Sequence, residues 1–421
     1  MLTRVDMGEL ILEVMSWQTR FVQAFTAVSG GQTRLDDLHV TVAAALTAHA
    51  LNVGFTPVIS GMPADPLPDQ PRRSELPAVG ELRRRERRAD RGPGRRRPGA
   101  GVGWWWPGRC SRRDPVRGAG AQHPRSTEPE LLRSAAWTTL LNLVNDQAVG
   151  VAGRVVSGTP RDSLHVIDLI YSQDGGKRPE VIISDTGSYS DIVFGLLRLL
   201  GFDYRPQLAD LPDTKLWRIN ASADYGPLDA TARGRIDLAR VRRHWPDILR
   251  LVASIHTGTI SAYDAMRMLQ AGGNLTQLGE ALAHLGRIFK TLHVLAYVDL
   301  LPYRREIKGM RNLQEGRYDL GRHVFHGRKG ELYRAYHEGM EDQHGALGLV
   351  LNCITLWNTV YLDTAIKQLR ATGYPILDAD VARLSPYLRK HINVHGHYSF
   401  QLPELGEGRR TLRDPDAGDE E

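Results

Sequence analysis

The chain has 421 residues, of which 42% are apolar and 24% charged, enough to form the cores of two or three domains. Its two cysteines, Cys110 and Cys353, lie far apart, which excludes a disulfide-built secreted scaffold and a cysteine-rich zinc module. The longest strongly apolar stretch, Gly345–Trp357, is too short to span a bilayer, and the first residues contain no apolar signal core. We therefore expect a cytoplasmic protein without a membrane partner.

The positive charge is concentrated in one segment. Residues 71–130 contain 16 Arg, no Lys and 7 acidic residues, whereas the whole chain has a net charge of only +6. The segment also contains 8 Pro and 9 Gly but no Ile, Phe, Tyr or Met, so it cannot form a packed core of its own. It is either a solvated, disordered linker or an Arg-rich arm that binds nucleic acid through runs such as Arg83–Arg85 and Arg95–Arg97.

Hydrophobic periodicity predicts two helices before this segment and a mixed pattern after it. Apolar residues at helical spacing predict helices over 8–28 and 36–53. From Thr138 onward the pattern predicts, in order, a hairpin over 138–156, a helix over 161–171, a buried strand over 180–184 and a helix over 191–200. This order is typical of a mixed α/β sheet. Beyond residue 235 the pattern predicts helices at 245–253, 261–269, 275–292, 313–324 and 346–369.

Two carboxylates stand where they could carry chemistry. Asp185 follows the buried strand and begins a Gly-bearing turn, a position from which a carboxylate can hold a metal over a cleft. An Asp before a turn is, however, more often a turn or cap residue. Glu315 lies off the apolar stripe of its helix, on a face shared with Arg322 and Asp319, where a Glu is usually a solvated surface residue. The residues alone leave both interpretations open.

Other candidate sites have weaker support. His391, His395 and His397 resemble a ligand cluster, but no carboxylate or Cys completes a metal set at useful spacing, so we expect surface or packing roles. The Gly-rich stretch 99–103 lacks the Lys-Ser/Thr of a phosphate loop. Ser184 has no nearby His, so a hydrolase triad has no support.

The order of several short motifs resembles the catalytic region of Tn3-family transposases, the replicative DDE enzymes of bacterial transposons. Residues 1–62 resemble the stretch just upstream of that domain, so the likeness covers most of the chain. The motifs that carry it are Asn145-Asp-Gln147, Gly158-Thr-Pro-Arg-Asp162, Ser184-Asp-Thr-Gly-Ser-Tyr-Ser-Asp191, Leu199-Leu-Gly-Phe202, His244-Trp-Pro-Asp-Ile-Leu249, His284-Leu-Gly-Arg-Ile-Phe289, Asn312-Leu-Gln-Glu-Gly-Arg317, Leu356-Trp-Asn-Thr-Val-Tyr361 and Ser385-Pro-Tyr-Leu-Arg-Lys-His-Ile392.

The resemblance implies an α/β fold: an RNase H-like DDE core with a large helical insertion, preceded by helices and a disordered Arg/Gly/Pro-rich segment. Six regions follow from it. They are an upstream helical region at 1–62, the disordered segment at 63–131, the α/β core at 132–232, the helical insertion at 233–305, C-terminal helices at 306–405 and an acidic tail at 406–421.

By the same resemblance, Asp185 is the second catalytic Asp and Glu315 the catalytic Glu, and both are metal ligands. The implied cofactor is magnesium, which prefers carboxylate and water oxygens and supports in-line displacement at phosphorus. The implied partner is DNA, as transposon ends and target, and the family allows a homodimer.

The first catalytic Asp of the family belongs on a first core strand within 64–131, where we expect no such strand. Trp104-Trp-Trp106-Pro107 is encoded by TGG TGG TGG CCN, which one base later gives Gly-Gly-Gly, a run that the family carries shortly before this Asp. The same frame allows Asp-Gly at the codons that straddle Arg112, Arg113 and Asp114. We therefore infer two compensating frameshifts, near residues 64 and 131.

This account predicts an inactive remnant, because Arg113 offers a cation where a bridging carboxylate is needed, and Asp114 would lack the required strand context. Two alternatives stay open. The chain is then either a non-enzymatic DNA-binding protein that uses the Arg-rich segment 71–130, or a helical interaction protein that interferes with an intact relative.

Overall fold

The structure is a computed structural model that describes residues 2–25, 37–60, 109–114, 138–157, 163–171, 178–184, 190–208, 214–271, 274–327, 340–403, 405–406 and 408–413. Its longer helices are α1 (Met7–Trp17), α3 (Leu38–Ala50), α6 (Ser163–Tyr171), α7 (Asp191–Leu199), α9 (Trp245–His256), α11 (Gln277–Asp299), α12 (Leu301–Val324) and α13 (Met340–Ala371). The shorter helices are α2 (Thr19–Gln23), α4 (Phe55–Ile59), α8 (Leu238–Arg243), α10 (Ala262–Met268) and α14 (Asp378–Val381).

The strands form one five-stranded sheet and three two-stranded pairs. The large sheet contains β2 (Arg109–Asp114), β3 (Thr138–Asn145), β4 (Gly150–Ser157), β5 (Val181–Ser184) and β6 (Asp203–Tyr204), in the order β4-β3-β2-β5-β6. The pairs are β1 (Val5–Asp6) with β11 (Ile392–Asn393), β7 (Trp217–Arg218) with β8 (Gly234–Arg235), and β9 (Gln270–Ala271) with β10 (Asn274–Leu275).

The sheet is mixed, as the sequence predicts. The predicted hairpin is confirmed, since β3 and β4 pair antiparallel, and the predicted buried strand is β5, all four residues of which are buried. β2 runs antiparallel to β3 and parallel to β5, and β6 extends the parallel part.

Our expectation of no strand within 64–131 is wrong for residues 109–114. These residues form β2, the central strand, with Ser111 in register with both Leu143 and Ser184. The strand forms despite its polar sequence because it lies between β3 and β5, and the backbone of a central strand can hydrogen-bond on both sides whatever its side chains are. The rest of the expected disordered segment lies outside the described residues.

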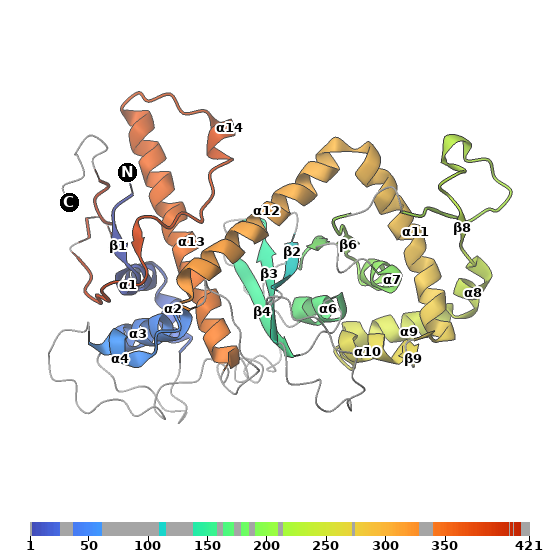
Figure 1. Cartoon of the computed structure of the whole chain (residues 1–421), viewed down its shortest axis with the longest axis horizontal. Coiled ribbons are helices and arrows are strands. Elements are labelled where there is room, and N and C mark those ends of the chain that lie inside the picture. Colours follow the sequence, from blue (N-terminus) through green and yellow to red (C-terminus); the bar gives the residue numbers. More distant parts are fainter. Residues whose placement is uncertain are drawn as a thin grey trace, which may run out of the picture.

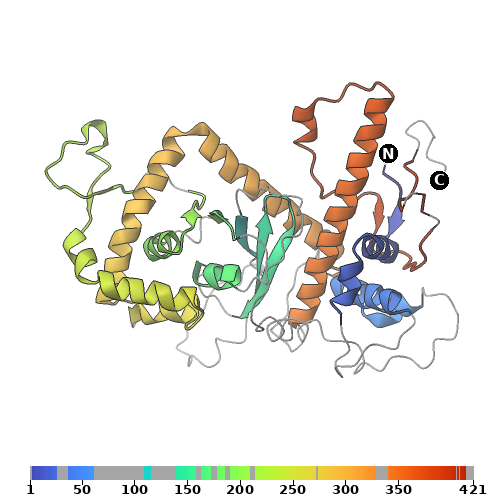
Figure 2. The same ribbon diagram turned by 180° about the vertical axis from the view of Figure 1, so that it is seen from behind.

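Helices cover both faces of the sheet. Ile182 of β5 points into a core with α6 and α7, while its neighbours Val181 and Ile183 pack against α12. This alternation is the two-residue period of a strand buried on both sides. Figures 1 and 2 show α6 and α7 on one side of the sheet and α12 and α13 on the other.

α11 and α12 are consecutive long helices that meet at an angle: α11 contacts α7, α8 and α9, and α12 contacts the sheet. α11 packs along α7, and the two backbones approach closely at Gly195 and Gly286, where an added Cβ would overlap backbone atoms of the facing helix. The chain then turns into α12, which crosses β2 and β5 and contacts α13 (Figure 1). The helices predicted after residue 235 are thus confirmed, several of them being longer than predicted.

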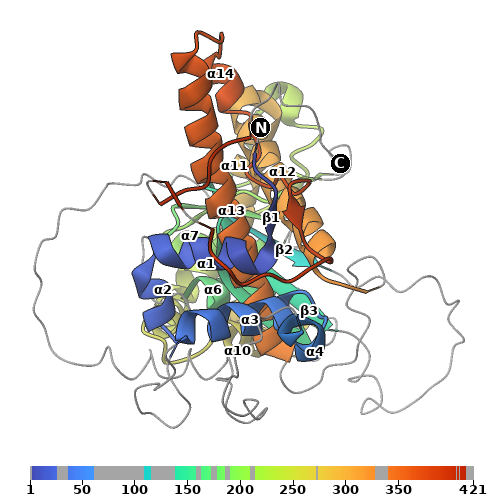
Figure 3. The same ribbon diagram turned by 90° about the vertical axis from the view of Figure 1, so that its left-hand side faces the viewer.

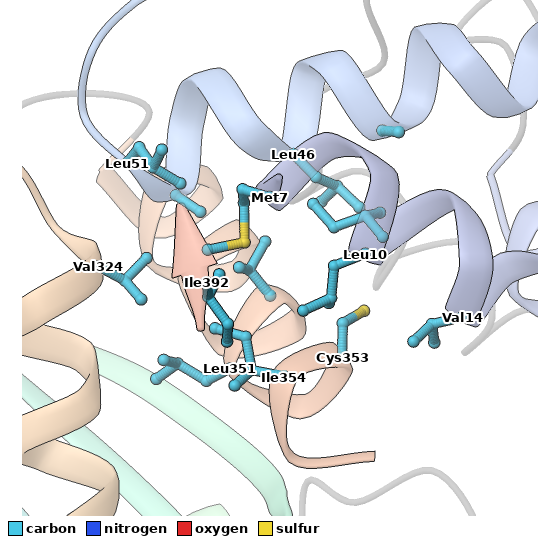
Figure 4. Packing of buried hydrophobic residues seen from close by; sticks show 14 of the residues in the cluster. Met7, Leu10, Val14, Leu46, Leu51, Val324, Leu351, Cys353, Ile354 and Ile392 are labelled. Carbon is cyan, nitrogen blue, oxygen red and sulfur yellow. The ribbon is translucent and has the colours of Figure 1, made fainter. Parts of the chain in front are cut away.

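A second core joins the start of the chain to α13. Met7, Leu10 and Leu46 are buried in this cluster with Ile354 (Figure 4), and Trp357 belongs to the same cluster. Figure 3 shows α1 and α3 lying against α13. The predicted helix over 8–28 is broken at Gln18 into α1 and α2, and residues 26–28 lie outside the described residues.

α13 alone among the described helices is long and apolar enough to span a bilayer, a test that the core helix of a globular domain also passes. Here its buried side chains include Trp357 and Tyr361, which pack against α1 within the second core. Its apolar character is therefore explained by packing within the protein.

Candidate active site

The candidate site begins at the carboxyl end of β5. Ser184, the last residue of this strand, is fully buried and its hydroxyl lies 2.7 Å from the Tyr204 hydroxyl of β6. The chain leaving β6 runs on beside β5, because Arg205 donates its amide to Ile182 and Gln207 donates its amide to the Ser184 carbonyl at 2.9 Å. Gln207 is thereby fixed beside Ser184, the last residue of β5, and the residue that follows Ser184 in the chain is Asp185.

Glu315 reaches the same edge of the sheet from α12. The Arg311 guanidinium, one helical turn earlier, donates to the Glu315 carboxylate at 3.4 Å and also to the side-chain oxygen of Gln207. Ser184, Gln207, Arg311 and Glu315 therefore form a continuous series of contacts from the end of β5 to the candidate catalytic Glu. The Glu315 side chain is 44% exposed, so it can still meet a ligand from solvent.

A buried histidine holds the segment that carries Gln207. His293 of α11 contacts the Pro206 carbonyl through Nε2 at 2.9 Å and the Tyr303 hydroxyl through Nδ1 at 2.8 Å. Since a carbonyl only accepts, Nε2 carries the proton and Nδ1 accepts from Tyr303. Burial lowers the pKa of His293 to about 4, and burial also raises the pKa of Tyr303, so both side chains are uncharged at neutral pH.

Arg205 braces the other side of this segment. Its guanidinium pairs with Asp203 at 2.7 Å and with Glu306 of α12 at 2.7 Å, and it lies over the ring of Tyr303. The carboxylate of Glu306 is thus already paired with a cation of the protein itself. These contacts fix the start of α12, and with it the helix face that carries Glu315, against the parallel edge of the sheet.

A cleft of about 680 Å³ opens along this face of α12 and ends at Glu315. Among the described residues that line it, four are cations and Glu315 is the one carboxylate. The residues that line it are Gln207, Tyr297, Leu301, Arg304, Arg305, Ile307, Lys308, Arg311, Asn312 and Glu315.

The opposite face of α12 is anchored in the protein interior. Arg317 is buried, donates to the Gly348 carbonyl at 3.0 Å and lies against Gly150, the first residue of β4 after the β3–β4 turn. Burial lowers its pKa to about 10, which still leaves it charged at neutral pH. Asn352 of α13 holds the same turn through two hydrogen bonds to the backbone of Gly150. With Arg317 facing inward, Glu315 faces the cleft.

Of the two predicted catalytic residues, only Glu315 belongs to the described part of the chain; Asp185 lies outside it. Glu315 contacts Arg311, whereas Asp319 pairs with Arg389 and Arg322 lies over the ring of Tyr318, so the neighbours we predicted for Glu315 have other partners. No group of three His, Cys, Asp or Glu able to hold a metal occurs among the described residues. The prediction of a shared metal site therefore stays a prediction.

The three C-terminal histidines occupy the packing and surface positions that we expected. His391 stacks on Trp357 and contacts Asn358, His395 contacts the His323 carbonyl, and His397 is mostly exposed.

Sequence reasoning missed Gln207 and Arg311. Arg311 was detectable, because a cation four residues before a Glu on a helix lies on the same face. Gln207 was not, because only the pairing beyond β6 brings it to the end of β5.

The sequence matches the family described as the Tn3 transposase DDE domain over residues 9–69 and 132–398. The matched ranges cover most of the chain and leave out residues 70–131, which coincide with the Arg-rich segment.

Several transposases are similar along nearly the whole chain. It is 53% identical to the transposase for transposon Tn4556 of Streptomyces fradiae, over 100% of this chain and 47% of that protein. Identity is 38% with the transposase for transposon gamma-delta of Escherichia coli, over 96% of this chain and 40% of that protein. The chain is 33% identical to the transposase for transposon Tn21, also of E. coli, over 98% of this chain and 42% of that protein. The chain thus spans less than half the length of these relatives, and by its match to the DDE domain it belongs to the Tn3 transposase family.

Proposed function

We propose that this chain is the catalytic region of a transposase that cleaves DNA strands at transposon ends and joins them to target DNA. The observation that carries the proposal is the series of contacts from Ser184 through Gln207 and Arg311 to Glu315. It brings the candidate catalytic Glu to the end of the strand that Asp185 follows. The family match and the printed names of the relatives support the same activity.

We further propose that the five-stranded sheet is an RNase H-like core. Its support is the strand order β4-β3-β2-β5-β6, in which an antiparallel three-stranded part joins a parallel pair through β2. In such a sheet the central strand and its parallel neighbour end side by side, where a ligand can contact residues from both. The residue after β5 is Asp185, the proposed second catalytic Asp.

The proposed cofactor is magnesium, held by Asp185 and Glu315. A bound magnesium ion would act as a Lewis acid on a phosphoryl oxygen and on the attacking hydroxyl. β2 continues past its register with β5 through Arg112 and Arg113 and ends at Asp114, so our expectation that Asp114 lacks a strand context is wrong. The proposed ligand set is still incomplete, because Arg113 offers a cation where the family resemblance implies the bridging carboxylate. We therefore propose no cleavage step for this copy and infer that it is an inactive remnant.

The reading-frame account explains the incomplete set. Residues 70–131, which the family match leaves out, are the residues expected to be out of frame. The inference fails at once if the bases encoding residues 64–131, read one base later, give no Asp-Gly after Gly-Gly-Gly.

A direct test compares this chain with a frame-restored chain, in which residues 64–131 are replaced by the shifted translation. Ligand binding raises the unfolding temperature only of a chain that folds a site for the ligand. We expect 10 mM magnesium to stabilise the frame-restored chain but not the present one, and Asp185→Asn or Glu315→Gln to abolish the effect. Equal stabilisation of all four chains would contradict the proposal, and so would none in the restored chain.

Further parts of the proposal concern context. We propose DNA as the partner and the cytoplasm as the location, and we allow for a homodimer. The second candidate function is a non-enzymatic DNA-binding protein, which the charge of residues 71–130 favours. DNA binding that depends on the arginines of this segment, measured by the titration described in the next subsection, would support this second candidate.

A further inference from the structure

The cleft beside Glu315 carries a one-sided charge. Of the described side chains that line it, four are cations, namely Arg304, Arg305, Lys308 and Arg311, and one, Glu315, is a carboxylate. All five come from α12. A wall of this kind raises the local concentration of anions, since low-dielectric walls lined by one sign of charge focus the field.

The cations form a row because of their spacing. Residues 304, 308, 311 and 315 recur at intervals of four, three and four, which places them on one face of a helix. At a rise of about 1.5 Å per residue, the row from Arg304 to Glu315 is about 16 Å long. A nucleic-acid strand of this axial length contains about five phosphates, at about 3.4 Å each.

Two of the four cations that line the cleft have charges that the protein leaves available. Arg305 and Lys308 are exposed, and neither forms an ion pair with another residue in the described part of the chain. Arg205 provides a contrast, because Asp203 and Glu306 neutralise it and its side chain is 18% exposed. Asp203 and Glu306 thus pair with Arg205 in the scaffold, while Arg305 and Lys308 of the cleft face solvent.

We propose that the row Arg304, Arg305, Lys308 and Arg311 binds consecutive phosphates of one DNA strand and leads that strand to Glu315. The strand then enters near the corner where α11 meets α12, which Figure 1 shows, and follows the cleft along α12 to Glu315. This inference rests on the proposed function for the identity of the polyanion. It deepens that function by assigning residues outside the DDE carboxylates to the binding of substrate.

The test measures how DNA affinity depends on salt, which reports the number of phosphates that a protein neutralises. The probe is a 30-base-pair fluorescent duplex, titrated by anisotropy at several salt concentrations between 50 and 200 mM without divalent cations. Removing two phosphate contacts lowers the slope of log affinity against log salt by about 1.8. We expect this reduction for the double variant Arg305→Gln/Lys308→Gln.

The control variant is Arg242→Gln/Arg243→Gln, which removes two exposed cations of α8 that do not line the cleft. It changes the net charge equally, and we expect it to leave the slope unchanged. A third variant replaces Arg83–Arg85 and Arg95–Arg97 with Gln. If the slope falls in this variant and not in the cleft variant, the inference is wrong and the Arg-rich segment binds the DNA.

Two further outcomes would overturn the inference: equal losses in the α8 and cleft variants, or stronger binding of an RNA duplex of the same length. These outcomes are separate from those of the proposed function, because the titration contains no magnesium and measures no chemistry. If the frame-restored chain fails to bind magnesium, the proposed function is contradicted but the salt slopes are unaffected. If it binds magnesium and the cleft variant shows no change in slope, only the inference about the cleft is contradicted.

Discussion

His293 shows how one buried side chain supports the candidate site and makes it sensitive to pH. Its neutral ring donates to Pro206 and accepts from Tyr303, two contacts that fix the segment before Gln207. A protonated ring has a proton on both nitrogens, so it can no longer accept from Tyr303. Burial disfavours that form and lowers the pKa to about 4.

This pKa predicts a loss of stability in weak acid. The folded-state pKa of about 4 is below the unfolded value of 6.5, so the unfolded chain takes up the proton first as the pH falls. The stabilisation is complete above about pH 6.5 and is lost toward pH 4. Between pH 7 and pH 5 we expect His293 to account for a loss of about 2 kcal/mol in the free energy of unfolding.

Urea unfolding of His293→Gln at the two pH values measures this contribution, and the variant should lose less stability on acidification than the parent chain. His397→Gln is the control, because that ring is 72% exposed, and it should lose as much as the parent. An unchanged pH dependence in His293→Gln would show that the ring carries no such linkage.

Within the site, the sequence could predict which residues carry charge but not what they contact. The position of Glu315 off the apolar stripe of its helix is visible in the sequence, and so is Arg311 one turn away. The contact of Gln207 with both Ser184 and Arg311 is not, because it joins residues more than 20 positions apart through a pairing that only the folded sheet creates. The helix face on which a charged side chain lies follows from local spacing, whereas the residues that it contacts depend on the tertiary fold.

At the scale of elements, long periodic segments were predictable and context-dependent strands were not. α11 and β5 follow from apolar spacing in the sequence alone. β2 does not, because Arg109–Asp114 has no strand pattern and forms a strand only between β3 and β5. Two-residue strands such as β6 are too short to give a periodic signal. The sheet order, which the proposed function needs, therefore came from the structure.

The packing of α7 against α11 depends on two glycines. A Cβ at Gly286 would overlap the Asp191 carbonyl, and one at Gly195 would lie 2.8 Å from the Leu282 carbonyl oxygen. Overpacking of a close contact typically costs about 1–3 kcal/mol, and more where backbone must move. We expect Gly286→Ala to lower the free energy of unfolding by at least about 2 kcal/mol.

Gly309→Ala is the matched control, since it is also a helix-interior glycine but its Cβ would meet no atom within 4 Å. It should raise stability by up to about 1 kcal/mol through helix propensity. Urea unfolding of both variants gives the comparison. Equal effects of the two substitutions would show that the α7–α11 contact is not tightly packed.

At the scale of the whole molecule, residues near both ends of the sequence meet on α13. The fully buried carboxylate of Glu13 accepts hydrogen bonds from Trp357, from Tyr361 and from the Arg410 guanidinium. Arg410 also pairs with Glu9 at 2.9 Å and donates its amide to the Tyr361 hydroxyl. Residues 408–413, within the region expected to be an acidic tail, thus pack on α1 and α13, while 414–421 lie outside the described residues.

This arrangement predicts that Arg410 contributes strongly to stability although it lies far along the chain from most of the core. Arg410→Met leaves the Glu13 carboxylate buried with its cation removed, which typically costs about 3–5 kcal/mol. The adjacent Arg409→Met is the control, because Arg409 bonds Thr364 at an exposed position and its loss should cost at most about 1 kcal/mol. Urea unfolding midpoints measure both.

Adding Glu13→Gln to Arg410→Met removes the buried negative charge that has lost its partner, so the double variant should be destabilised by less than the sum of the single changes. Additive effects, or equal losses for Arg409→Met and Arg410→Met, would show that the buried pair does not couple the two ends of the sequence.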